Sequence, residues 1–333
     1  MRRITLSHRI QHLLLLGVSR VVRFLPERSA LGIGSALGWI AGSVLRVRRS
    51  VVLENLGRAF PERDERWRRR IASASYRHLA REAVFLLRLP SMDRDALIGR
   101  CQVEGLELVR KALESGRGAV ILTGHFGNWE LGGSAIAAHG VPLDIVARAQ
   151  TNPLFDEYLE RTRQVHGLRV IYREDAPGRI LRSLRESRAV ALAADQNVSR
   201  GGIFVDFFGH PAATARGPAL LSKRARAPAF VALVRRLEGH LARYRITFEP
   251  LAAPEASEGR EESVRFLSRY LSALEAAVRD APEQYFWMHR RWKTRPGEEV
   301  QRLDEEAPPP DEESPLPNEE APRRTRNRPR RSW

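Results

Sequence analysis

The sequence contains a single cysteine, Cys101, among 333 residues. This count excludes an internal disulfide and any cluster of cysteine metal ligands, and Cys101 fits the role of a small buried hydrophobic side chain. Signatures of nucleic-acid recognition are also missing, since no zinc finger, basic zipper or RNA-recognition motif occurs and aromatic residues make up only 7% of the chain. We therefore expect no specific nucleic-acid partner.

Long hydrophobic runs are scarce, and none reaches the ~18–20 residues of a confident membrane-spanning helix. Residues 13–18 form one apolar stretch, and residues 30–45 form a second, uncharged and rich in glycine. Arginines flank the first stretch, which is typical of a helix lying in, or partly penetrating, an anionic bilayer surface. We expect residues 1–47 to form membrane-associating helices. The alternatives are a pair of core helices, or a signal peptide without a clear cleavage site.

Acidic residues are outnumbered, with 40 Asp and Glu against 56 Lys and Arg, for a net charge of +16. A basic surface suits an acidic protein or lipid phosphates, and the planar fork of arginine binds two phosphate oxygens at once. Residues 298–333 form a charged, proline-containing tail with almost no apolar residues, and we predict it to be disordered. Its basic end could contact a membrane or nucleic acid, or have no specific partner.

Between residues 119 and 248, short apolar runs alternate with helical patterns. The alternation predicts an α/β fold, with a central mostly parallel or mixed sheet layered by helices, over residues 48–297. Residues 51–90 are expected to be helical, and residues 199–213 to form a loop. The predicted strands cover residues 119–122, 143–146, 170–172, 190–194, 229–233 and 244–248, and the predicted helices cover residues 129–138, 152–166, 178–186 and 214–226.

A histidine and a glutamate stand five residues apart where the first of these strands meets its helix, in the segment His125-Phe126-Gly127-Asn128-Trp129-Glu130. Asn128 is a suitable N-cap for the helix. If His125 lies on the loop and Glu130 in the first helical turn, the carboxylate can orient the imidazole as a general base. In isolation, the pattern favours the simpler interpretation of a polar loop followed by an acid that complements the helix dipole.

Other polar residues follow predicted strands in the same way. His125, Arg148 and Asp195 each come directly after a strand, and sites in α/β sheets gather at the carboxyl ends of strands. Asn152 can cap the next helix, which carries Arg163. Further along, Thr214 can cap a helix after a glycine turn that contains Phe207 and Phe208. Each of these features, taken singly, could be purely structural.

Together these segments resemble the bacterial late acyltransferases of lipid A assembly, the lauroyl/myristoyl acyltransferase family, which is related to glycerolipid acyltransferases. The resemblance covers roughly residues 10–296. It is carried by these motifs: His125-Phe126-Gly127-Asn128-Trp129-Glu130, Asp195-Gln196, Phe207-Phe208-Gly209 with Ala212 and Thr214, Pro282-Glu283-Gln284-Tyr285 with Trp287, His289-Arg290-Arg291, and Lys293-Thr294-Arg295-Pro296.

The resemblance implies a glycerolipid-acyltransferase-like fold and a membrane-associated O-acyltransferase at the cytoplasmic face of the inner membrane. Such an enzyme moves a fatty acyl chain from acyl-carrier protein to a hydroxyl of a lipid A precursor, a phosphorylated glycolipid. No covalent intermediate, metal or redox cofactor is expected. The family motif makes His125 the base and Glu130 its orienting acid, and it links Arg163 and Asp195 to activity.

We assign a further set of residues to substrate binding: Asn128, Arg148, Asn152, Gln196, Phe207, Phe208, Thr214, Arg290 and Lys293. Arg290, Arg291 and Lys293 are expected at the rim, against the headgroup or the carrier. Two alternatives remain at this point. One is the same chemistry on another membrane lipid, such as a phosphatidylinositol mannoside, a lysophospholipid or an ornithine-type lipid. The other is a non-enzymatic basic protein that binds membranes, for which a base and its orienting acid would have no purpose.

Overall fold

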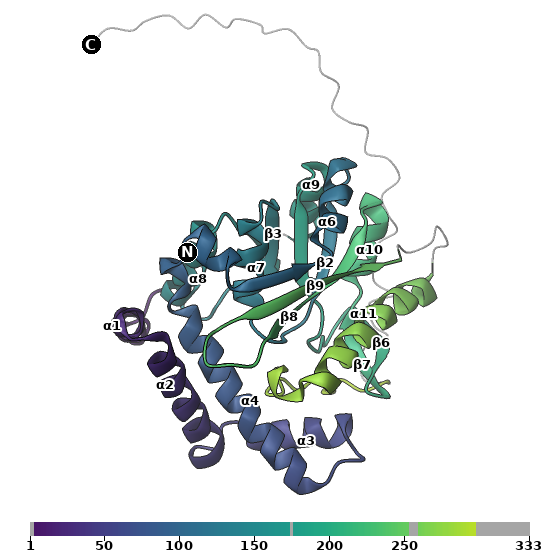
Figure 1. Cartoon of the computed structure of the whole chain (residues 1–333). Coiled ribbons are helices and arrows are strands. Elements are labelled where there is room, and N and C mark those ends of the chain that lie inside the picture. The colour runs from purple at the N-terminus through teal and green to yellow at the C-terminus, as the bar shows by residue number, and fades with distance from the viewer. Residues whose placement is uncertain (1–2, 174–175, 253–258, 298–333) are drawn as a thin grey trace, which may run out of the picture.

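The computed structural model describes residues 3–173, 176–252 and 259–297. Its centre is a seven-stranded sheet in the order β1-β9-β8-β2-β5-β3-β4 (Figure 1). All neighbouring strands are parallel except β8 and β9, so the predicted mostly parallel sheet is confirmed. The strands are β1 (Cys101–Glu104), β2 (Ala119–Thr123), β3 (Leu143–Ala147), β4 (Arg169–Tyr172), β5 (Ala189–Ala193), β8 (Ala229–Arg236) and β9 (Tyr244–Leu251).

Helices cover both faces of this sheet, which explains why its central strands read as continuous apolar runs. In β2, Ile121 packs into one core cluster while Val120 and Leu122 pack into the other. The helices that contribute to the Ile121 cluster include α5 (Arg94–Ile98), α6 (Leu106–Glu114) and α7 (Trp129–Ala138). Those of the opposite cluster include α9 (Ala176–Arg185), α10 (Gly217–Ala225) and α11 (Arg260–Asp280). Helix α8 (Pro153–Val165) leads from β3 to β4.

The N-terminal helices form a separate layer outside the sheet (Figure 1). They are α1 (Leu6–Phe24), α2 (Glu27–Trp39) with a π-helical turn (Ile40–Val44), α3 (Arg49–Ala59) and α4 (Glu65–Leu86). Helices α2 and α4 pack closely because glycines of α2 face the backbone of α4. A Cβ atom at Gly38 would come within 2.3 Å of the Tyr76 carbonyl oxygen, so a larger residue there would push the helices apart.

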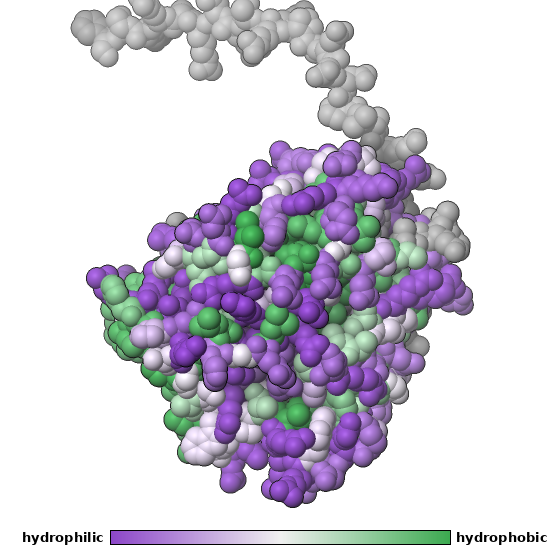
Figure 2. All heavy atoms as spheres, viewed as in Figure 1, coloured by the Kyte–Doolittle hydropathy of each residue, from purple (hydrophilic) through white to green (hydrophobic). Residues whose placement is uncertain are grey.

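The outer side of this layer is strongly apolar. Leu13 and Leu14 of α1 are 67% and 64% exposed, and Figure 2 shows apolar surface along the edge where Figure 1 places α1 and α2. Within the part of the chain that the structure describes, no single helix is long and apolar enough to cross a bilayer. Residues Glu27–Val44 and Arg49–Ala59 meet that criterion only as a pair, with a bend of 91° between them.

Two expectations about local structure were wrong. Residues 199–213 do not form a simple loop, since most of them belong to a hairpin of β6 (Gly202–Phe207) and β7 (His210–Ala215). The turn residues Phe208 and Gly209 both have positive φ, and the sequence does not signal this because phenylalanine rarely adopts that conformation. Thr214 therefore lies fully buried in β7 rather than capping a helix, and α10 begins later, at Gly217.

The remaining predicted strands and helices of the sheet domain are present, with ends shifted by a few residues. The sequence did not predict the edge strand β1 or the helices α5, α6 and α11. It also did not predict the 3-10 turns Leu89–Ser91, after α4, and Pro282–Gln284, after α11. The predicted disordered tail, residues 298–333, lies outside the described residues.

Candidate active site

The loop between β2 and α7 carries His125, and two other residues of this loop, Gly127 and Asn128, fix its conformation. The Asn128 side chain accepts a hydrogen bond from the Leu131 amide at 2.9 Å, which confirms it as the N-cap of α7. Gly127 has a φ of +61°, and a Cβ atom there would lie 1.6 Å from the carbonyl oxygen of Val234. Only glycine fits this position, so the backbone next to His125 is pressed directly against β8.

A second segment of the chain fastens the same loop from another side. The Gly127 amide donates to the Gln284 carbonyl and the Phe286 amide donates to the His125 carbonyl, both at 3.0 Å. Phe126 and Tyr285 therefore form an antiparallel bridge. The conformation of His125 depends on three segments that are far apart in the sequence.

The carboxylate that hydrogen-bonds to His125 is Asp195 and not Glu130. Asp195 Oδ1 lies 2.7 Å from His125 Nδ1, and Asp195 Oδ2 accepts a hydrogen bond from the His125 amide at 2.8 Å. Asp195 is 1% exposed. Two contacts from one carboxylate fix both the ring and its backbone, so the expectation that Glu130 makes this bond was wrong.

Glu130 is instead paired with Arg163. Arg163 Nη2 and Nε donate to the two Glu130 oxygens at 2.6 and 3.0 Å, a bidentate pair between α7 and α8. Both side chains are largely buried but still border the cavity that contains His125. Glu130 and Arg163 thus remain beside the histidine without touching it through a hydrogen bond.

The surrounding charges favour protonation of His125. Burial by itself would lower the pKa of the His125 imidazole, but the charge and hydrogen bond of Asp195, together with the charge of Glu130, outweigh burial and raise it. Burial would raise the pKa of Asp195, yet His125 and Arg291 outweigh that effect and hold it below its ordinary value. Asp195 is therefore ionised, and it stabilises an imidazolium at His125.

Arg291 lies inside the protein and not at the rim, so that expectation was also wrong. It is 1% exposed, and its guanidinium donates to the Ala213 carbonyl at 2.7 Å and to the Thr214 hydroxyl at 2.6 Å. These contacts account for the buried position of Thr214 and orient the arginine charge beside Asp195. From inside the core, the positive charge of Arg291 favours the ionised form of Asp195.

A cavity of about 400 Å³ opens beside His125, between the sheet and the helices α7 and α8. The carbon-rich part of its wall includes Ile121, Ile136, Leu143, Ile145, Leu159, Leu168, Ala232 and Val234. Its polar residues are Thr123, His125, Glu130, Arg148, Gln150, Arg163, Arg173 and Gln196. Arg148 and Arg173 are exposed, whereas Leu143 and Val234 are buried. The cavity therefore joins an apolar interior to a basic entrance.

The substrate-binding residues predicted from the sequence fall into two groups. Arg148 and Gln196 line the cavity, and Gln196 Nε2 lies 3.3 Å from His125 Nε2. The rest lie outside it. Asn152 caps α8 and donates to His8 and Gln11 of α1, Phe207 and Phe208 are buried in an aromatic cluster with Trp287 and Trp292, and Arg290 and Lys293 are exposed on the surface.

The order of the strands explains which residues meet. β2, β5 and β3 are adjacent in the sheet, and His125, Asp195 and Arg148 follow their respective carboxyl ends. The prediction that these three residues share one edge is confirmed, and this signal could have identified Asp195 as the partner of His125. No local pattern marked the buried residues Glu82, Arg236 and Tyr244, which lie behind the loop. Among the described residues, no group of His, Cys, Asp or Glu has a geometry that could hold a metal ion.

The fold and this geometry define an α/β protein with a histidine–aspartate pair beside a partly apolar cavity. Residues 2–294 match the family model of the bacterial lipid A biosynthesis acyltransferases, and the chain belongs to that family. It is 29% identical over 277 residues to the lipid A biosynthesis palmitoleoyltransferase of Escherichia coli (strain K12), covering 82% of this chain and 87% of the relative.

Two further relatives show the breadth of the similarity. The chain is 28% identical over 284 residues to the lipid A biosynthesis lauroyltransferase of Escherichia coli (strain K12), covering 84% of this chain and 90% of that protein. It is 32% identical over 214 residues to a phosphatidylinositol mannoside acyltransferase of Mycolicibacterium smegmatis (strain ATCC 700084 / mc(2)155). This match covers 61% of this chain and 67% of that protein. The protein is thus an acyltransferase, with relatives named for lipid A biosynthesis and for phosphatidylinositol mannoside.

Proposed function

We propose that the protein transfers a fatty acyl chain from acyl-carrier protein to a hydroxyl of a lipid A precursor, with His125 as the general base. The observation that carries this proposal is the position of His125. It is held by the buried Asp195 and stands at the boundary between a basic entrance and an apolar cavity. That boundary is where a hydroxyl on a charged headgroup would meet the carbonyl carbon of an acyl chain.

The reaction needs no residue other than His125 to move a proton. Nδ1 is occupied by Asp195, so Nε2 accepts the proton of the acceptor hydroxyl as its oxygen bonds to the thioester carbon. Asp195 stabilises the resulting imidazolium. When the carbon–sulfur bond breaks, the imidazolium returns the proton to the departing thiolate. General-base assistance of this kind contributes ~10²–10⁴-fold to the rate.

The tetrahedral intermediate also needs hydrogen-bond donors for its oxyanion. The Gly127 amide is already bonded to the Gln284 carbonyl and cannot serve without breaking that contact. Gln196 is better placed, since its side-chain amide carries two N–H groups and the contact with His125 Nε2 at 3.3 Å uses only one of them. We assign oxyanion stabilisation to Gln196.

The two ends of the cavity suit the two substrates. The apolar wall fits the hydrocarbon of the acyl chain, which is removed from water there. Arg148 and Arg173 at the entrance suit the phosphates of a lipid A precursor, because arginine binds phosphate oxygens through its planar fork. Arg290 and Lys293, exposed on the surface, are suited to the acidic carrier protein.

The apolar outer side of α1 and α2 supports attachment to the cytoplasmic face of the inner membrane. Liposome sedimentation of a Leu13→Asp/Leu14→Asp variant tests this attachment, and the variant should bind less. Val165→Asp is the matched control, because Val165 is similarly exposed at 63% but lies on α8. Equal binding by both variants would place the attachment elsewhere.

Transfer itself is tested with purified protein, acyl-carrier protein bearing a fatty acyl thioester, and a lipid A precursor. Acylated product should appear, and Gln196→Ala should form it ~10²–10³-fold more slowly. A normal rate for Gln196→Ala would contradict the oxyanion assignment. Lipid mass spectrometry of a strain without the gene should show lipid A lacking one acyl chain. Unchanged lipid A would contradict the choice of acceptor.

A second candidate function is the same transfer to another membrane glycolipid. It is favoured by the 32% identity to a phosphatidylinositol mannoside acyltransferase. The two candidates share His125, Asp195 and the cavity and differ only in the acceptor. The same mass spectrometry separates them, because a changed phospholipid or mannoside beside intact lipid A would support the second candidate.

A further inference from the structure

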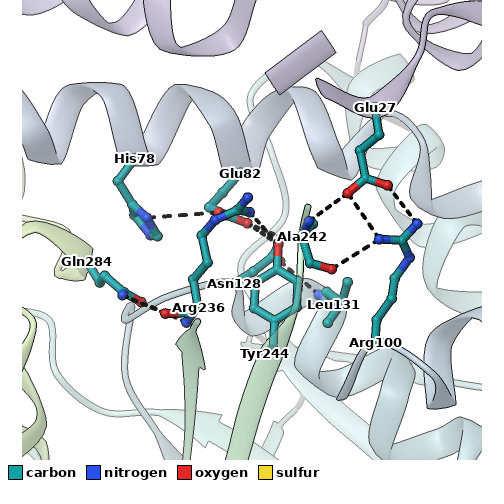
Figure 3. Close-up of polar contacts among 10 residues, drawn as sticks. All are labelled: Glu27, His78, Glu82, Arg100, Asn128, Leu131, Arg236, Ala242, Tyr244 and Gln284. Atoms are coloured by element: carbon teal, nitrogen blue, oxygen red, sulfur yellow. Dashed lines mark hydrogen bonds and ion pairs between the residues drawn. The ribbon is translucent and has the colours of Figure 1, made fainter. Parts of the chain in front are cut away.

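Behind the His125 loop lies a buried polar cluster centred on Glu82 of α4 (Figure 3). Three side chains donate to its carboxylate: Asn128 at 2.8 Å, Tyr244 at 2.6 Å and Arg236 at 2.9 Å. All four residues are less than 7% exposed. The cluster joins α4, the cap of α7, and the strands β8 and β9 at one point.

An ion pair in such a position is expensive. Removing Glu82 and Arg236 from water is costly, and well-packed apolar residues would often stabilise a fold as well or better. Stability alone is therefore a weak explanation for this cluster. Here the geometric role is specific, because one of the three donors to Glu82 belongs to the loop that carries His125.

The contact between Glu82 and Asn128 determines how the loop is oriented. The Asn128 amide nitrogen donates to Glu82, so its oxygen is left facing the Leu131 amide that it caps. Asn128 is three residues from His125. Loss of the acceptor at Glu82 would leave the Asn128 amide free to turn, and the cap and the start of α7 would loosen with it.

Arg236 ties the second attachment of the loop to the same cluster. Gln284 bonds through its side chain to both the amide and the carbonyl of Arg236, at 2.8 and 2.9 Å. The backbone carbonyl of Gln284 in turn accepts the Gly127 amide. Glu82 thus acts on two neighbouring residues of the loop, directly on Asn128 and through Arg236 and Gln284 on Gly127.

We propose that Glu82 is a positioning residue for His125, which keeps the imidazole aligned with Asp195 and with the cavity without contacting substrate. The proposal rests on His125 being the base. Helix α4 therefore contacts two parts of the molecule. Glu82 on one side bonds to the His125 loop, and the opposite side of the helix packs against α2.

The test is Glu82→Gln in the full chain, which keeps the shape of the side chain and removes its charge. We expect kcat to fall by ~10–100-fold, the effect of a small misplacement of a reacting group, with KM for both substrates nearly unchanged. Glu27→Gln is the matched control. Glu27 also accepts two bonds from Arg100 and one from the Ala242 amide, but it touches no residue of the loop (Figure 3).

Both variants should lower the melting temperature, and only Glu82→Gln should lower kcat. A loss of kcat in both, or in neither, would overturn the proposal. If Glu82→Gln does not fold, Asn128→Ser replaces it, because serine still caps α7 but cannot donate to Glu82 as the amide does.

A second readout does not depend on activity. Titration of His125 by NMR of labelled histidine should show its pKa moving toward the ordinary value in Glu82→Gln, since misalignment weakens the bond to Asp195, and remaining unchanged in Glu27→Gln. An unchanged His125 titration in Glu82→Gln would reject the positioning role. If His125 moves in the titration but His125→Ala is fully active, the proposed function fails while the structural link to Glu82 stands.

Discussion

Two carboxylates lie near His125, and their surroundings differ. Asp195 comes from another strand, is fully buried, and bonds to both the ring and the backbone of the histidine. Glu130 comes from the same short motif, borders the cavity, and is held by Arg163. Nearness in the sequence therefore did not decide which carboxylate became the partner of the histidine.

The difference assigns the two acids separate tasks. In the dry interior beside Arg291, Asp195 can hold one tautomer and stabilise the imidazolium. Glu130 and Arg163 form part of the cavity wall, where their charges are paired and largely buried. Substitutions of His125 and of each of the two acids test these roles separately.

Replacement of the histidine itself should have the largest effect. His125→Ala removes the base, and kcat should fall by ~10²–10⁴-fold, close to abolition. Circular dichroism and liposome binding should remain as in the wild type, because Asp195 keeps its hydrogen bond from the backbone amide of residue 125 and the nearby charge of Arg291. Purified His125→Ala with near wild-type kcat would be fatal to the proposed mechanism.

Exchange of each acid for its amide compares the two carboxylates directly. Asp195→Asn should lower kcat by ~10³-fold, because a neutral amide can hold the wrong tautomer of the histidine. Glu130→Gln should lower kcat by only ~10–100-fold. The bond between Asp195 and the His125 ring remains, and the variant changes only the charge at position 130 and the pair with Arg163. Steady-state kinetics on both variants decide this, and the reverse order would restore Glu130 as the orienting acid.

The pH dependence of kcat/KM should also show how the nearby carboxylates affect the pKa of His125. His125 accepts a proton only when neutral, and its pKa is raised, so kcat/KM should decline as pH falls through a value above the ordinary ~6.5. Glu130→Gln removes a charge that raises this pKa, and the acidic limb should therefore move to lower pH. A limb that stays in place would show that Glu130 does not influence the histidine.

The smallest effects should come from the arginines, and salt should distinguish them. Arg163→Ala should lower kcat at every salt concentration, because its pair with Glu130 is largely buried. Arg290→Ala should mainly raise KM at low salt, since exposed charges are screened beyond ~8–10 Å at physiological ionic strength. Kinetics at several salt concentrations check both. A normal rate for Arg163→Ala, or a salt-independent loss with a lower melting temperature for Arg290→Ala, would contradict these assignments.

Much of the fold was readable because its signals are local. The apolar run of β2, the Asn128 cap and the start of α7 are specified by neighbouring residues, and the structure confirms them. Because sites in α/β sheets gather at the carboxyl ends of strands, the sequence also predicted that His125, Arg148 and Asp195 lie at one edge of the sheet. The β6–β7 hairpin was missed because its turn places a phenylalanine at positive φ, which no composition rule favours.

The sequence by itself determined the α/β architecture, the position of the His125 loop and the membership of the family. Only the tertiary structure decided that Asp195 holds the ring, that Arg291 is buried beside it and that Glu82 lies behind the loop. Capping, alternation and turn chemistry act between residues a few positions apart, and they can be read along the chain. Partners 46 to 70 positions apart meet only when helices and strands have packed, and their pairing is set by that packing.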